Sequence, residues 1–478
     1  MMAEASGKLT GKPGVLFVTR GPGATNASSG LHVAFQEVDY RAFFGPLVKW
    51  AAEVEDTARL PEYIDRAFRV AQTGRPGPVV LALPEDMLSA EADVADGPPQ
   101  PLPAPAVPDG FAAEAMARLA KAEKPLVVVG GPHWNQEAQA DLQAWAEASG
   151  LPVAVTFRRQ DYMDNRHPNY VGDLGVGMNP KLGAALGEAD FVLLLGTRLS
   201  ETATNGFELL DPAAPGVDIW HAHADAAELG RVWPATRSVA APAPAVVAAL
   251  KAASAPVQCD AWLDRLRAQY ETWQSPVESP GAVRMEAVVR WLSETLPEDA
   301  ILTNGAGNYA AWLHRYFRYK GFRTQLAPTS GSMGYGFPAS IAASLAHPDR
   351  PVVCLAGDGC FQMTLNEMST ARQHGAKPIT IIANNGRYGT IRMHQEKHYP
   401  GRVSGTDLAN PDYAALARAY GGFGVCVTAQ EQFADVFALA QASGLPALIE
   451  LQLDPEALTT SQTLGAVRAA GLAAQGAG

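Results

Sequence analysis

The chain has 478 residues, of which 47% are hydrophobic and 18% are charged, and its formal net charge is −12. A chain of this length is too long for one hydrophobic core and, at roughly 150 residues per domain, predicts about three domains. The acidic balance argues against nucleic acid as a partner, because such binding needs clustered Lys and Arg side chains, and no apolar run is long enough for a membrane span. We therefore expect a cytoplasmic protein that acts on small molecules.

Short apolar runs rich in β-branched residues alternate with helix-like stretches along the chain. The runs lie at residues 14–18, 78–83, 126–129, 191–195, 352–356 and 379–383. Because they are apolar throughout, they suit parallel strands that crossover helices bury on both faces. The predicted fold class is α/β, with three doubly wound domains and mainly parallel sheets.

Two breaks divide this pattern. Residues 98–108 are rich in proline, which lacks a backbone donor, so they predict a linker. A second break at residues 275–281 follows an amphipathic run, Asp260 to Trp273, that predicts a connecting helix. The predicted domains are residues 1–95, 110–252 and 280–460. The Ala- and Gly-rich end, residues 469–478, predicts a loose tail.

The strongest local signal is Gly357-Asp358-Gly359-Cys360-Phe361 directly after one predicted strand, with Asn384-Asn385 directly after the next. Ligands collect at the carboxyl ends of parallel strands, so both turns should open on one crevice. Asp358 and Asn385 offer the oxygen ligands that Mg²⁺ prefers, and the glycines let backbone amides approach a phosphate. A single Gly-Asp-Gly turn, however, often only ends a strand.

Together with the helical stretch from Met363 to His374, these turns resemble the signature of enzymes that depend on thiamine diphosphate (ThDP). The resemblance implies that the side chains of Asp358 and Asn385 and the carbonyl of Arg387 bind Mg²⁺. It also implies that ThDP contacts the remaining turn residues and two other segments: Gly357, Gly359, Cys360, Gly386, Gly307, Asn308, Tyr309, Ser332 and Met333. In the family, an apolar side chain at the position of Met333 holds the cofactor in its bent shape.

Other segments extend the resemblance over nearly the whole chain. Residues 10–14, 21–26 and 73–78 are similar to the family's pyrimidine-binding domain, and residues 111–250 are similar to its central domain, which carries FAD in some members. The chain is similar to acetolactate synthase (acetohydroxyacid synthase) large subunits in particular. This implies a 2-oxo acid decarboxylase or carboligase that forms a ThDP-bound enamine from a substrate such as pyruvate and passes it to an acceptor. It also implies a homodimer or homotetramer, because the family builds its active site between subunits.

The positions that contact substrate in the family are only partly matched. Lys49 matches a substrate-channel lysine, and His394 stands where the family has a tryptophan that shapes the acceptor pocket. Both are therefore candidate catalytic residues. Thr202 replaces an arginine that binds the carboxylate of the second substrate, and Gly307-Asn308-Tyr309 replaces a Gly-Gln-His. The physiological substrate and acceptor stay open.

Two departures bear on activity. The glutamate that activates the pyrimidine ring in relatives would precede Met1, and relatives insert a segment with a strand and an active-site glutamine between Ala34 and Phe35. We interpret the chain as a truncated form of a normal enzyme. The alternative is an inactive ThDP-binding or regulatory homologue. We expect this exact chain to bind ThDP weakly and to turn over slowly or not at all.

Three other patterns have simpler explanations. His394 and His398 are four residues apart but lack a third ligand, which favours a surface or pocket role over a metal site. Arg158 and Arg159 could meet a nucleotide phosphate in the middle domain or form an exposed pair, so FAD stays open as a cofactor. The α/β pattern alone would also allow an NAD- or FAD-dependent oxidoreductase, but Gly21-Pro22-Gly23 lacks the third glycine of a dinucleotide fingerprint.

Overall fold

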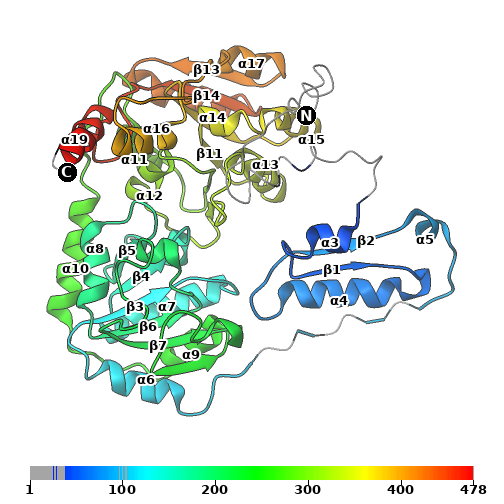
Figure 1. Cartoon of the computed structure of the whole chain (residues 1–478), viewed down its shortest axis with the longest axis vertical. Helices are drawn as coiled ribbons and strands as arrows, with labels where there is room; N and C mark the ends of the chain where they lie inside the picture. The colour runs from blue at the N-terminus through cyan, green and yellow to red at the C-terminus, as the bar shows by residue number, and fades with distance from the viewer. Residues whose placement is uncertain are drawn as a thin grey trace. The chain divides into compact units, whose positions relative to one another are not determined.

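The computed structural model describes residues 38–95, 97–98, 101–102 and 105–476, together with Thr25 and Ser28 (Figure 1). The chain divides into two units, Met1–Ala104 and Pro105–Gly478. The division falls inside the predicted proline-rich linker, whose described residues belong to no helix or strand. Apart from Thr25, the motifs at residues 10–14 and 21–26, the strand predicted at 14–18 and the Ala34/Phe35 junction lie outside the described residues.

The described part of the first unit is a βαβ motif. Strands β1 (Trp50–Glu53) and β2 (Val79–Ala82) pair in parallel, with Trp50 opposite Val79. Parallel neighbours need a crossover, and α4 (Leu60–Gln72) provides it. The flanking elements are α3 (Tyr40–Phe44), the 3₁₀ turn η1 (Thr57–Arg59) and α5 (Glu85–Ser89).

The first half of the second unit is a doubly wound domain around a six-stranded parallel sheet of order β5-β4-β3-β6-β7-β8. Its strands are β3 (Pro125–Val129), β4 (Val153–Thr156), β5 (Tyr170–Leu174), β6 (Phe191–Leu195), β7 (Asp218–His223) and β8 (Arg237–Ala240). Its helices and 3₁₀ turns are α6 (Phe111–Leu119), α7 (Gln136–Ser149), η2 (Gln160–Tyr162), α8 (Pro180–Glu188), η3 (Glu201–Thr204), η4 (Ala226–Glu228) and α9 (Ala243–Ala252). Strands β3 and β6 are buried along their whole length, as their apolar runs predict. The predicted connecting helix is confirmed as α10 (Asp260–Trp273).

The second half contains another six-stranded parallel sheet, of order β10-β9-β11-β12-β14-β13. Its strands are β9 (Ile301–Asn304), β10 (Gln325–Leu326), β11 (Val352–Gly357), β12 (Ile379–Asn384), β13 (Phe423–Val427) and β14 (Ala447–Gln452). Helices α11 (Met285–Thr295), α12 (Ala310–Tyr316) and α18 (Phe433–Ala442) cover one face. Helices α13 (Gly336–Ala346), α14 (Asp358–Phe361), α15 (Met368–His374) and α17 (Tyr413–Ala419) cover the other. Two 3₁₀ turns, η5 (Leu365–Glu367) and η6 (Gln430–Gln432), complete the domain.

The predicted fold class is confirmed, because the paired strands of the described residues are all parallel and helices cover both faces of the sheet in this domain. The predicted helix from Met363 to His374 is shorter than expected, since η5 occupies its first turn and α15 begins only at Met368. In the described part of the chain, no helix combines the length and the apolar character that a membrane crossing requires.

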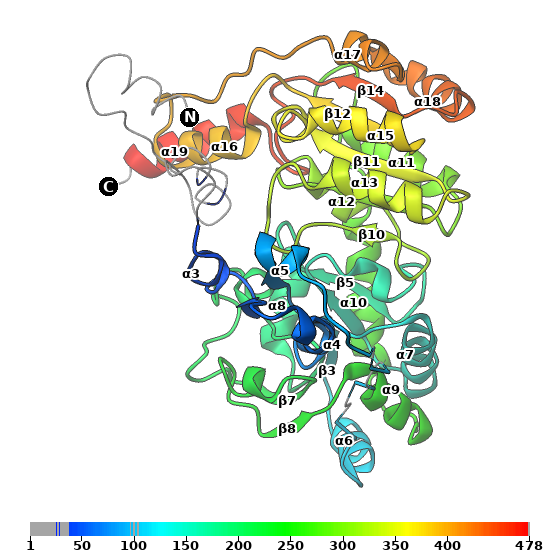
Figure 2. The same ribbon diagram turned by 90° about the vertical axis from the view of Figure 1, so that its right-hand side faces the viewer.

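The prediction of a loose C-terminal tail is wrong. Residues Leu464–Gly476 form helix α19, which lies alongside α16 (Gly389–His398) (Figures 1 and 2). Gly471 permits this close approach, because a Cβ there would lie 2.5 Å from the carbonyl oxygen of Glu396. Arg468 adds a salt bridge to the Glu396 carboxylate. The helix is therefore held by the buried side chains of Leu464 and Val467, by the close approach at Gly471 and by the ion pair of Arg468.

Candidate functional site

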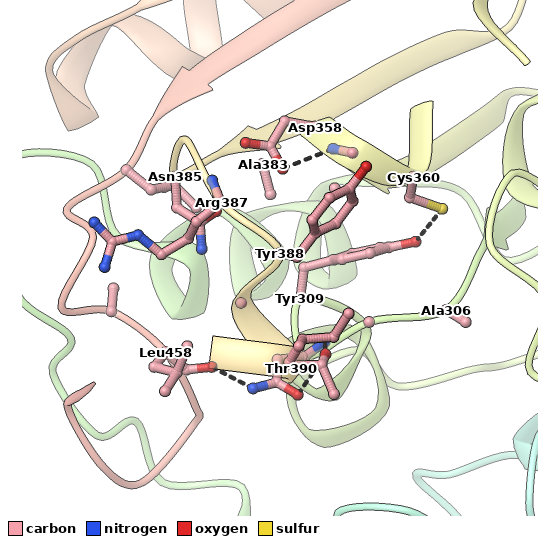
Figure 3. Close-up of a pocket in the computed structure, with 18 of the residues that line it drawn as sticks. Ala306, Tyr309, Asp358, Cys360, Ala383, Asn385, Arg387, Tyr388, Thr390 and Leu458 are labelled. Atoms are coloured by element: carbon pink, nitrogen blue, oxygen red, sulfur yellow. Dashed lines mark hydrogen bonds between the residues drawn. The ribbon is translucent and has the colours of Figure 1, made fainter. Parts of the chain in front are cut away.

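A cavity of about 80 Å³ opens at the carboxyl ends of β11 and β12 in the C-terminal domain (Figure 3). Both strands run in the same direction, so the turns that follow them meet at this edge, as predicted from the sequence. Most of the predicted cofactor residues line the cavity: Gly307, Asn308, Tyr309, Met333, Gly357, Asp358, Gly359, Cys360, Asn385 and Arg387. Ser332 and Gly386 lie in the same loops without lining it.

Asp358 is the buried carboxylate of this site. It begins α14 directly after β11 and is 3% exposed. Its Oδ1 accepts a hydrogen bond from the amide of Gly359 at 2.8 Å, and its Oδ2 accepts one from the amide of Gly386 at 2.9 Å. Burial raises the pKa of the Asp358 carboxyl, and hydrogen bonds from Asn410 and these amides oppose that rise. The carboxylate is thus fixed between the two turns.

The turn after β12 presents further oxygen atoms. Asn384 donates to Glu450 Oε1 at 2.6 Å, and its own Oδ1 accepts from the Gly386 amide at 3.1 Å. Asn385 Oδ1 accepts from the Arg387 amide at 3.3 Å. Gly386 has a φ of +67°, which glycine adopts without strain. The turn therefore holds Asn385 and Arg387 beside Asp358.

The donor set fits a small hard cation. Carboxylate, amide and backbone carbonyl oxygens are the ligand types of Mg²⁺. Among the described residues, no group of three or more His, Cys, Asp and Glu side chains is arranged to hold a metal ion. A metal here would thus depend on the amide of Asn385 and the carbonyl of Arg387 in addition to Asp358.

The opposite wall of the cavity is held by Asn308. Its Nδ2 donates to the carbonyl of Leu458 at 3.2 Å, and its Oδ1 accepts from Thr390 Oγ1 at 2.9 Å. The backbone amide of Asn308 in turn donates to Thr390 Oγ1 at 3.0 Å. These contacts join the loop after β9 to the start of α16 and to the segment after β14 (Figure 3).

Two tyrosine rings pack directly over the glycines. A Cβ on Gly357 would lie 2.8 Å from the ring of Tyr309, and one on Gly359 would lie 2.6 Å from the ring of Tyr388. Tyr309 donates its hydroxyl to Cys360 Sγ at 3.2 Å, and burial raises the pKa of Tyr309 well above its usual range. The glycines at these positions are therefore required by packing.

Comparison with known proteins identifies the family. Models of the thiamine pyrophosphate enzymes match three parts of the chain: the N-terminal TPP-binding domain at residues 1–38, the central domain at residues 112–250 and the C-terminal TPP-binding domain at residues 305–451. The acetolactate synthase large subunit of Parasynechococcus marenigrum is 31% identical over 94% of this chain and 78% of its own length. The chain belongs to the thiamine pyrophosphate enzyme family.

Two further relatives cover similar shares. The acetolactate synthase of Mycobacterium leprae is 31% identical over 95% of this chain and 79% of its own length. The large subunit of acetolactate synthase isozyme 2 from Escherichia coli is 28% identical over 95% of this chain and 86% of its own length. The alignments with the P. marenigrum and M. leprae proteins extend over 497 and 498 positions, more than the 478 residues of the chain. These relatives therefore carry residues inside the aligned region that this family member lacks.

Neither candidate substrate residue is among the residues that line the cavity in the second unit. Lys49 belongs to the first unit, where its Nζ donates to the carbonyl of Thr73. His394 is exposed on α16 and stacks on His398, with ring centroids 6.2 Å apart. Thr390 and Ile391, on the first turn of the same helix, do line the cavity.

A flavin in the central domain would bind at the point where the strand order reverses, between β3 and β6. Trp134 fills this edge: it is 4% exposed, and its indole donates to the carbonyl of Gly130 at 2.9 Å. A Cβ on Gly131 would lie 1.7 Å from the carbonyl oxygen of Gly196, so the two strand ends are in direct contact. These contacts describe the switch point itself, and FAD stays a prediction for the central domain.

Several residues of the site were not among those predicted from the sequence. They include Ala306, Tyr388, Thr390 and Leu458 in the lining, and Asn410 beside Asp358. Tyr388 and Thr390 could have been inferred from their position, because they directly follow the turn after β12. Leu458 and Asn410 carry no local signal, since the fold brings them to the site from loops far along the chain.

Proposed function

We propose that this protein is a ThDP- and Mg²⁺-dependent 2-oxo acid decarboxylase or carboligase of the acetolactate synthase type. The observation that carries the proposal is the buried carboxylate of Asp358, which backbone amides hold toward the turn that contains Asn385. Asp358, Asn385 and the carbonyl of Arg387 would hold Mg²⁺. Gly357, Gly359 and the loop at residues 305–309 would hold the diphosphate.

When bound, ThDP supplies a nucleophilic carbon and an electron sink for the decarboxylation of a 2-oxo acid. The protein's own part is to bind and orient. Asp358 is fixed by three hydrogen bonds, and apolar side chains of Met285, Met333 and Trp312 line the same cavity and limit the access of water. We further propose that Lys49 and His394 contact the substrate and that the protein forms a homodimer or homotetramer.

A second candidate function is cofactor binding without turnover. The alignments that exceed the length of the chain favour it, because residues present inside the aligned region of the relatives are absent here. Both functions require the same ThDP and Mg²⁺ site. The formation of product distinguishes the enzyme from a protein that only binds the cofactor.

The test uses the purified chain with pyruvate, ThDP and Mg²⁺. Cofactor binding is measured by isothermal titration calorimetry, and acetolactate and CO₂ are measured in parallel. Binding with product supports the enzyme, and binding without product for any 2-oxo acid supports the second candidate. Asp358→Asn should weaken Mg²⁺-dependent binding by more than about 100-fold, because it removes a charged ligand. The matched control is Asp435→Asn on the exposed face of α18. If the wild-type chain does not bind ThDP, both functions are refuted.

A further inference from the structure

Arg158 crosses from the central domain to the cofactor loops of the C-terminal domain. It follows β4 at the carboxyl edge of the central sheet and is 5% exposed. Its guanidinium donates to the carbonyl of Gly305 at 3.2 Å and to the carbonyl of Pro328. Gly305 opens the loop that carries residues 307–309, and Pro328 precedes the turn that carries Ser332 and Met333. One side chain therefore holds both loops.

The charge of Arg158 is not balanced within the described part of the chain. Its guanidinium donates to carbonyl oxygens there, and its buried Nε has no hydrogen-bond partner among the described residues. Burial lowers the pKa of Arg158 to about 10, while the nearby Tyr309 and Cys360 raise it, so the guanidinium is still charged at neutral pH. Burying a cation without an anion is costly, which suggests that an anion completes the environment.

The segment around Arg158 is anchored firmly enough to position the loops. The amide of Gln160 donates to Gln325 Oε1 at 2.9 Å, and the side chain of Gln325 donates back to Gln160 Oε1 at 3.0 Å. Asp161 Oδ2 accepts from the amides of Thr324 and Gln325 at 3.2 and 3.3 Å. These bonds join the central domain to β10 in a buried polar seam, so Arg158 cannot shift freely.

We propose that Arg158 is a positioning residue for the diphosphate end of ThDP: it holds the loops at residues 305–309 and 328–334 through their carbonyls and leaves an uncompensated positive charge beside the anionic site. This inference rests on the proposed function. From the sequence, Arg158 is expected either to contact a nucleotide phosphate in the central domain or to lie on the surface. The geometry favours neither, because the side chain is buried and is directed to the other domain.

The test variant is Arg158→Gly. The backbone at Arg158 has a φ of +59°, a left-handed conformation that glycine adopts without strain, so the substitution removes the guanidinium and spares the local backbone. Arg158→Lys keeps the charge but cannot donate to two carbonyls in the same geometry. The matched control is Arg159→Ala, because Arg159 donates to the carbonyl of Arg158 and packs its guanidinium on Tyr162.

Binding of ThDP, and separately of inorganic pyrophosphate as a probe of the diphosphate site, is titrated at saturating Mg²⁺ by calorimetry. We expect Arg158→Gly to weaken both ligands by about tenfold or more, Arg158→Lys to weaken them less, and Arg159→Ala to leave them unchanged. Added guanidinium ion should restore part of the affinity of Arg158→Gly and have no such effect on the wild type. Thermal unfolding and oligomeric state are measured for each variant.

The proposal is overturned if Arg158→Gly binds both ligands as the wild type does, or if it loses ThDP and pyrophosphate without any rescue by guanidinium. If Arg158→Gly does not fold, the comparison of Arg158→Lys with Arg159→Ala decides, and equal affinities for these two refute the role. Failure of the wild-type chain itself to bind ThDP would instead refute the proposed function. The two failures are therefore distinguishable.

Discussion

Asn410 donates a side-chain hydrogen bond to the Oδ2 atom of Asp358 at 2.8 Å. The same amide group donates to Asn384 Oδ1 at 2.8 Å, and Asn410 Oδ1 accepts from Gln362 Nε2 at 2.6 Å. Asn410 thus spans the turns after β11 and β12 and uses its donors and its acceptor. It fixes the rotamer of a proposed Mg²⁺ ligand without being a ligand itself.

Substitution of Asn410 by serine should therefore weaken metal binding. A serine hydroxyl is too short to reach both turns, so Asp358 would lose one of its hydrogen bonds and part of its orientation. Loss of such a supporting contact typically lowers metal affinity by about 10- to 100-fold. The affinity for Mn²⁺ in the presence of ThDP, measured by electron paramagnetic resonance, is the readout.

The control for this prediction is Asn366→Ser, because Asn366 is exposed in η5 and donates to its neighbour Glu367. It should bind Mn²⁺ as the wild type does. Equal Mn²⁺ affinities of Asn410→Ser and Asn366→Ser would show that Asn410 does not support the site.

A steric prediction concerns Gly305, which lies next to the thiol of Cys360. A Cβ on Gly305 would lie 2.4 Å from Cys360 Sγ and 2.9 Å from the hydroxyl of Tyr309. Gly305→Ala should therefore displace Tyr309 and lower ThDP affinity by about tenfold, in line with overpacking costs of about 1–3 kcal/mol. Cys360→Ala removes the nearer atom, so the double variant should recover part of the lost affinity. Strictly additive effects in calorimetric titrations would contradict this packing account.

Much of the fold and of the site could be predicted from the sequence because the signals are local. The strand predicted at residues 191–195 coincides with β6, and the helix predicted from Asp260 to Trp273 coincides with α10, since uninterrupted apolar runs and amphipathic spacing have few other stable structures. Asp358 and Asn385 share a site because each directly follows a parallel strand. The proximity of these two residues is a consequence of strand direction alone.

The missed features depend on tertiary contacts. Asn410 reaches Asp358 from a loop between α16 and α17, and no nearby pattern predicts that contact. Arg158 resembles a surface arginine in sequence, yet the seam between two domains buries it. Helix α19 has a composition that suggests a tail, but the fit of Gly471 against α16 and the ion pair of Arg468 with Glu396 explain its order. Distant contacts of this kind cannot be deduced from periodicity.

Asp161 lies in the buried polar seam between the central domain and β10, and it should make the free energy of unfolding depend on pH. Burial raises the pKa of Asp161 to about 6, opposed mainly by the hydrogen bond from the Gln325 amide. The unfolded carboxyl has a pKa of about 3.9, so between about pH 4 and pH 6 the unfolded state loses its proton while the folded state keeps it. Stability should fall by about 2–3 kcal/mol as the pH rises through this window and should be level above it.

Asp161→Asn removes this charge and should abolish that part of the pH dependence. Its melting temperature relative to the wild type should therefore rise between pH 4 and pH 6.5. The control is Asp164→Asn, because Asp164 forms a salt bridge with Arg166 outside the buried carboxylate network. Melting temperatures from scanning calorimetry over this range test the prediction, and parallel curves for the wild type and Asp161→Asn would contradict it.

The last prediction concerns the attachment of α19 to the helix that carries Thr390 and Ile391. The Glu396 carboxylate is fully buried and accepts two hydrogen bonds from Arg468, at 2.9 and 2.7 Å, and one from the amide of Gly401. The Arg468 hydrogen bond lowers the pKa of Glu396 to about 2, so the carboxylate contributes stability at every pH above about 4 and loses it as the pH falls toward 2.

Arg468→Met should leave this carboxylate buried without its cation, at a cost of about 3 kcal/mol, and should release α19 to limited proteolysis. ThDP affinity should fall with it, because α16 forms one wall of the cavity. The double variant Arg468→Met/Glu396→Met replaces the pair with apolar side chains and should regain most of the stability, since no charge stays buried alone. If Arg468→Met resists protease as the wild type does while its melting temperature is unchanged, the ion pair does not hold α19, and the contact at Gly471 is sufficient.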